Sequence, residues 1–86
     1  MPIQLGEFEV LVLLAVLRLG DGAAPPAVRA ELERRAQRTV ARGAVYVTLD
    51  RLEAKGLLAS RSVPGVDPSA RPRRTYKVAA KGFRAL

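Results

Sequence analysis

One stretch of the sequence combines small, apolar and basic side chains in a spacing suited to a narrow anionic groove. Residues 42–58 read RGAVYVTLDRLEAKGLL, and their hydrophobic period is that of a helix. The inner side of this helix is Val45, Leu49 and Leu52. At about 100° per residue, the outer side consists of Gly43, Ala44, Val47 and Arg51. Small side chains let a helix backbone approach another surface closely, and arginine pairs with phosphates and base edges.

The charge balance of the whole chain favours an anionic partner. The 86 residues include 15 Lys and Arg against 8 Asp and Glu, which gives a formal net charge of +7, and twelve of the basic residues are arginines. This excess indicates nucleic acid first and an anionic membrane surface second. Solvated arginines in an arginine-rich genome are the alternative, but genome bias explains the preference for arginine over lysine and not the net charge.

The residue types that are missing argue against catalysis. The chain has no cysteine and no histidine, which excludes disulfides, thiolate catalysis, the usual zinc sites and imidazole bases. No pair of carboxylates has a spacing that suggests acid–base chemistry, so we expect no enzyme, no metal and no cofactor. The longest apolar run, residues 10–17, is shorter than the ~20 residues that span a bilayer, and no signal peptide is recognisable. We expect a cytoplasmic protein that does not bind membranes.

The elements around this helix are predicted from period and breaker residues, and we treat residues 1–86 as a single domain. Helices are expected at about 5–19, 25–37 and 42–55; Gly20 and Gly22 end the first, and Pro25 and Pro26 begin the second. After Gly56 the period changes to two, which predicts strands at about 57–63 and 74–79, joined by a Pro- and Gly-rich basic loop. Residues 80–86 are typical of the start of another helix.

Three helices followed by a two-stranded hairpin is the order of a winged helix-turn-helix, so the predicted class is mainly α with a small β-hairpin (α+β). The third helix would contact double-stranded DNA through Arg42, Gly43, Ala44, Tyr46, Val47, Thr48 and Arg51. The flank and the wing would contact it through Arg38, Arg71, Arg73 and Arg74. Asp50 and Glu53 would oppose a phosphate, so we place them away from the DNA. A protein-interaction face is the alternative interpretation of the same surface.

The first helix is apolar on two sides, which predicts a core position and a subunit interface together. One stripe contains Leu5, Phe8, Val12, Ala15, Val16 and Leu19. The other stripe, with two residues from the end of the sequence, predicts the interface of a homodimer: Val10, Leu13, Leu14, Leu17, Phe83 and Leu86.

Three segments resemble the PadR family of bacterial winged-helix transcription regulators: LGEFEVLVLLAVLRLGDGA, RGAVYVTLDRLEAKGLLASR and RPRRTYKVAAKGFRAL. The third-helix pattern of that family, G-x-x-Y-x-x-L-x-R-L-E-x-x-G-L, is present from Gly43 to Leu57. The resemblance covers nearly the whole chain. It implies a dimeric repressor on an inverted-repeat operator, with the third helix in the major groove and the wing beside it.

The sequence departs from the family pattern at three places. Ala41 stands where the family commonly has a serine cap before the third helix, and Ala24, Pro25 and Pro26 replace a Tyr-Gly-type pair. The family dimerises through a long C-terminal helical element, of which only the first turns are present up to Leu86. Either the first helix is the main dimer surface or further residues complete it. Neither an operator sequence nor an effector ligand is indicated.

Overall fold

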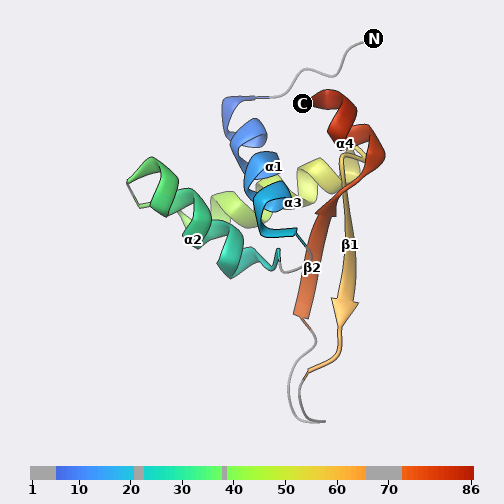
Figure 1. The fold of residues 1–86 in the computed structure, drawn as a ribbon. Helices are drawn as coiled ribbons and strands as arrows, with labels where there is room; N and C mark the ends of the chain where they lie inside the picture. The colour runs from blue at the N-terminus through green and yellow to red at the C-terminus, as the bar shows by residue number, and fades with distance from the viewer. Residues whose placement is uncertain (1–5, 21–22, 38, 66–72) are drawn as a thin grey trace.

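The computed structural model describes residues 6–20, 23–37, 39–65 and 73–86. Three helices come first in the chain: α1 (Glu7–Leu19), α2 (Pro25–Ala36) and α3 (Arg42–Ala54). They are followed by β1 (Leu58–Val63), β2 (Arg73–Val78) and the short helix α4 (Ala80–Ala85). The hairpin of β1 and β2 projects away from the helices (Figure 1). The predicted fold class is confirmed, and the ends of the elements differ from expectation by one or two residues.

Local backbone chemistry explains where the first two helices begin and end. The N–H of Gly6 donates to the Glu9 carboxylate at 3.0 Å and so closes the first turn of α1. Pro25 occupies the first turn of α2, where a missing N–H costs nothing. The residue that follows each helix has a positive φ, 63° at Gly20 after α1 and 55° at Gln37 after α2.

The hydrophobic core lies where the three long helices meet the base of the hairpin. Val12, Val28 and Leu49 are fully buried, and each comes from a different helix. The other buried members are Leu13, Ala15, Val16, Ala23, Leu32, Val40, Val45, Leu52, Leu57, Leu58, Tyr76 and Val78. The apolar sides of the three helices therefore face one shared core, as amphipathic helices in a small domain must.

The hairpin is antiparallel and is joined to the helical body through its second strand. Ser60 pairs with Tyr76, and the neighbouring pair is Arg61 with Thr75. The N–H of Tyr76 also donates to the carbonyl oxygen of Ala23 at 3.0 Å, just before α2. The predicted loop arginine Arg71 lies outside the described residues.

Two charged clusters join the helices to one another. The buried carboxylate of Glu31 on α2 accepts hydrogen bonds from Arg18 of α1 at 2.8 Å, from Arg35 at 3.2 Å and from Arg34. These three guanidinium groups, with Arg18 contributing most, lower the pKa of Glu31 to about 2. The positive ends of three side chains thus offset the cost of burying one carboxylate.

The second cluster joins the beginning of α1 to the end of α3. The ammonium of Lys55 donates to the Glu9 carboxylate at 2.8 Å. This bond is the largest cause of the lowered pKa of Glu9, and the bond from the N–H of Gly6 adds to it. The orientation of α3 is therefore fixed at its C-terminal end as well as through the core.

Candidate nucleic-acid interface

The outer face of α3 is exposed, as the helical period predicts. Val47 lies near the middle of this face and is 56% exposed. Gly43, Ala44, Arg42 and Arg51 are also exposed. The inner residues Val45, Leu49 and Leu52 are buried in the core, so the division of this helix into a core side and an outer side is confirmed at these positions.

Thr48 does not lie on that outer face, and the expectation that it does is wrong. Its side chain is only 6% exposed. Thr48 is one turn from Leu52 and three residues from Val45, so the three share one side of the helix. The buried side of α3 is wider than the three-residue stripe seen in the sequence.

The segment that leads into α3 is held by side chains of α2. Arg29 donates from Nε to the carbonyl oxygen of Val40 at 2.8 Å, and the N–H of Val40 donates to the Glu33 carboxylate at 2.8 Å. Ala41 at the N-cap makes no side-chain hydrogen bond to the helix, and Thr39 is exposed. The entry into α3 is thus fixed from outside the helix, without a capping side chain over its first N–H groups.

Arg42 and Tyr46 form one edge of the exposed face of α3. The guanidinium carbon of Arg42 lies 5.5 Å from the centroid of the Tyr46 ring, a cation–π geometry. Tyr46 is 37% exposed. Both residues border a cleft of about 370 Å³ between the first turns of α2 and α3, which is also lined by Pro25, Pro26, Arg29, Ala30, Glu33 and Val45. A stacked guanidinium is less mobile than a free one, so the Arg42 cation is held at one edge of the exposed face of α3.

The wing presents its cations on both strands. Arg73 and Arg74 are exposed on β2, and Arg61 is exposed on β1. Arg61 is not among the residues predicted to contact DNA, although the strand alternation of residues 57–63 indicates its side; in the structure it pairs with Thr75. Arg38 and Arg71, also predicted to contact DNA, lie outside the described residues.

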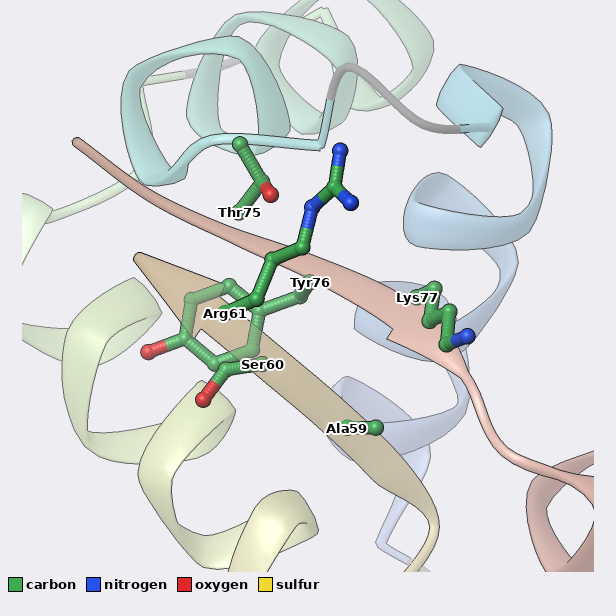
Figure 2. A pocket seen from close by; sticks show the side chains of 6 residues that line it. All are labelled: Ala59, Ser60, Arg61, Thr75, Tyr76 and Lys77. Atoms are coloured by element: carbon green, nitrogen blue, oxygen red, sulfur yellow. The ribbon is translucent and has the colours of Figure 1, made fainter. Parts of the chain in front are cut away.

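The hydroxyl groups of Ser60 and Tyr76 lie on one face of the hairpin. A hollow of about 310 Å³ is lined by Ala59, Ser60, Arg61, Thr75, Tyr76 and Lys77. Figure 2 shows the Ser60 and Tyr76 hydroxyls on one side of the paired strands and the Arg61 and Thr75 side chains on the other. This alternation follows from the period of two in a strand.

The face with the two hydroxyls is connected to the acidic flank of α3. The Ser60 hydroxyl donates to the carboxylate of Glu53. Burial raises the pKa of the Tyr76 phenol, while a hydrogen bond from Arg74 acts in the opposite direction. The bond to Tyr76 raises the pKa of Arg74, and the negative charges of Glu53 and Asp50 add to this effect. Asp50 and Glu53 therefore act on the wing from the flank of α3.

The residues predicted for the dimer interface separate into two groups. Leu17, Phe83 and Leu86 are exposed by 42%, 55% and 46%, and Val10 and Leu14 are half-buried. Leu13 is fully buried in the core, so its prediction as an interface residue is wrong. The reason is that α1 packs against α2, α3 and β2 at once, which covers more of its circumference than one stripe.

Residues 6–20, 23–37, 39–65 and 73–86 contain no group of three acidic side chains that could hold a metal ion. Within the same ranges, no helix has both the length and the apolar character needed to cross a membrane.

The three helices and the two-stranded wing, with an exposed basic-edged face on α3, define a winged helix-turn-helix protein. The family model described as the transcriptional regulator PadR-like family matches residues 13–86. Because this match covers most of the sequence, the chain belongs to the PadR-like family of transcriptional regulators.

Solved structures support the same assignment. A PadR-like transcription factor from Bacteroides fragilis has a TM-score of 0.76 at 25% identity, over 90% of this chain and 70% of that one. A PadR family regulator from Eggerthella lenta has a TM-score of 0.70 at 29% identity, over 91% and 68%. Bacillus subtilis PadR in complex with operator DNA has a TM-score of 0.72 over 93% and 45%, but at 16% identity it shows the fold alone. No curated protein sequence matches this chain.

Proposed function

We propose that this PadR-like regulator is a sequence-specific DNA-binding repressor that acts as a homodimer on an inverted-repeat operator. The observation that carries the proposal is the outer face of α3, which exposes Gly43, Ala44 and Val47 between the cations Arg42 and Arg51. A helix without bulky side chains at its centre fits the major groove, which is about 12 Å wide. Its edge arginines then reach the phosphates on either side.

The wing supplies the second contact in this proposal. Arg73 and Arg74 on β2 are exposed, and the hairpin projects from the helical body (Figure 1). Arginines on such a projection bind phosphates or the adjacent minor groove. The fold of Bacillus subtilis PadR, solved with operator DNA, is the same winged helix, which supports this use of the scaffold. We place the protein in the cytoplasm, where it has access to the chromosome.

The exposed apolar residues of α1 and α4 support a second copy as partner. Leu17, Phe83 and Leu86 expose large apolar side chains. A small domain gains stability when a partner covers such side chains. A two-fold dimer presents two copies of α3 to half-sites about 34–36 Å apart, one turn of the duplex. A two-fold dimer therefore predicts an operator that is an inverted repeat.

Selection of bound duplexes from a random library tests the proposal. We expect enrichment of a motif with two inverted half-sites, and a dissociation constant that rises steeply with salt because bound phosphates release counterions. Sedimentation of the free protein and of the complex measures the stoichiometry, which should be two chains per operator. Displacement by random-sequence DNA as efficiently as by the enriched motif would contradict sequence specificity.

A protein-interaction module is the second candidate, because exposed Val47 and Tyr46 also suit a protein partner. The two proposals differ in their dependence on charge. Replacing Arg42, Arg51 and Arg74 together by glutamine should abolish binding to duplex DNA, whereas a partner docked on the apolar face would still bind.

A further inference from the structure

We propose that Val47 is a specificity-determining residue that recognises the C5-methyl group of a thymine in the operator. This inference rests on the DNA-binding function proposed above. Val47 is 56% exposed on the outer face of α3, a larger exposed fraction than that of Tyr46 on the same helix. On a helix that enters the major groove, a side chain at the middle of the outer face lies nearest to the base edges.

The chemistry around Val47 restricts what this part of α3 can recognise. Its neighbours on the same face, Gly43 and Ala44, have no side-chain hydrogen-bonding group, and Val47 itself can neither donate nor accept. Thymine is the base that presents an apolar group, its C5-methyl, in the major groove, whereas the other base edges present hydrogen-bonding atoms there. An apolar side chain facing a donor or acceptor would leave that polar group unpaired, so thymine is the favoured neighbour.

Three polar side chains of α3 are buried or interact elsewhere, and Arg51 lies at the rim of the face. Thr48, which could have bonded to a base edge, is buried. The negative charge of Asp50, whose carboxylate could accept from cytosine, is one of the smaller causes of the raised pKa of Arg74 on the wing. Arg42 stacks on the Tyr46 ring at the edge of the face. Val47 is therefore the side chain placed to contact the bases at the centre of the face.

Removal of single methyl groups from the DNA tests the inference directly. The enriched operator is synthesised with each thymine replaced in turn by uracil, which lacks only the C5-methyl group. For the natural protein we expect about fourfold weaker binding at one or two positions of each half-site, the equivalent of ~0.8 kcal/mol for one buried methyl. For the Val47→Ala variant the same uracil duplexes should bind as well as their thymine counterparts.

Two controls separate this effect from general damage. Val63→Ala removes the same side-chain atoms from β1 of the wing and should retain the uracil sensitivity of the natural protein. Thermal unfolding of Val47→Ala should match that of the natural protein, since the side chain is exposed. Val47→Thr, which keeps the shape but exchanges one methyl for a hydroxyl, should show intermediate sensitivity.

The outcomes distinguish this inference from the function on which it rests. If a motif is enriched but replacing thymine by uracil leaves the affinity of the natural protein unchanged, the inference about Val47 is overturned and the proposed function stands. The same holds if the replacement weakens binding equally for Val47→Ala and for the natural protein. Failure to enrich any motif overturns both the sequence-specific function and the inference. Uracil sensitivity that disappears in Val47→Ala and persists in Val63→Ala supports both.

Discussion

The hydroxyl of Ser60 on β1 donates a hydrogen bond to the carboxylate of Glu53 on α3. This bond joins the base of the wing to the helix proposed to enter the major groove. Glu53 is therefore in an unusual position for an acidic residue near DNA: its charge repels phosphate, while its oxygen holds the wing.

Replacing Glu53 by alanine separates these two effects. Simple electrostatics predicts tighter DNA binding because one negative charge is lost. If the Ser60 bond orients the wing, Glu53→Ala should instead weaken operator binding by about 2- to 10-fold, the range that one hydrogen bond provides. Titration of labelled operator with the variant measures the change.

Glu53→Gln is the matched control, because the amide keeps an oxygen that accepts from Ser60 while losing the charge. It should bind the operator at least as tightly as the natural protein does. Equal tightening by Glu53→Ala and Glu53→Gln would show that the carboxylate acts only as a repulsive charge.

The cluster around Glu31 predicts how stability depends on pH. The pKa of Glu31 is lowered from 4.5 to about 2, first of all by Arg18. A lowered folded-state pKa means that the carboxylate stabilises the fold fully above its unfolded value and loses this contribution as the pH falls from about 4.5 to 2. The free energy of unfolding, measured with urea between pH 7 and 2, should therefore decrease from about pH 4.5 to pH 2; we call this decrease the acid limb.

Arg18→Gln removes the largest cause of that shift. The folded-state pKa of Glu31 should rise toward 4.5, so the variant should be less stable at neutral pH and its stability should depend less on pH between 4.5 and 2. Arg84→Gln, at an exposed position of α4, serves as control and should leave the acid limb unchanged. An acid limb of the same size in Arg18→Gln would show that another group causes it.

Gly82 permits α4 to pack against Leu57, just before β1, and against Val78 of β2. A Cβ at this position would overlap the carbonyl oxygen of Leu57, which already accepts from the N–H of Ala79 at 2.9 Å. Gly82→Ala should therefore destabilise the protein by about 1–3 kcal/mol, as overpacking does. The midpoint of thermal unfolding measures it. Gly43→Ala, where a Cβ meets open space, should be neutral or stabilising; equal losses for both variants would contradict the steric explanation.

Arg51 is predicted to bind phosphate or a base edge at the rim of α3. In Arg51→Gln, the slope of log Kd against log salt concentration should decrease by about 1 per protomer if the contact is to phosphate. If the contact is to a base, the salt slope should stay the same, and the variant should discriminate less between bases at one operator position. Arg84→Gln again provides the comparison, and a variant indistinguishable from it would remove Arg51 from the interface.

The sequence predicted the parts of the fold that depend on local periodicity. The core side of α3, with Val45, Leu49 and Leu52, follows from a single helical period, because each of these residues faces the same neighbours. The change of period after Gly56 predicts β1, β2 and their pairing as a hairpin, but the register of the two strands is known only from the structure. The exposure of Val47 follows from the same geometry.

The errors arose where several elements pack around one helix. The sequence predicts Leu13 at the dimer interface and Thr48 at the DNA, but both are buried. The hydrophobic period of a helix shows which side is buried. It does not show how wide that side is, because the width depends on how many elements pack around the helix. The bond from Ser60 to Glu53 and the cluster at Glu31 likewise depend on tertiary positions that spacing along the chain does not contain.

The backbone bond between Tyr76 and Ala23 makes β2 the central member at the root of the wing, with β1 on one side and Ala23 on the other. A strand held along both edges resists bending more than a strand held along one. Any flexing of the wing against a duplex is therefore expected beyond this point, from the Ser62–Arg74 pair outward. The root of the wing then moves with the helical body, and only the outer part adapts to the shape of the DNA.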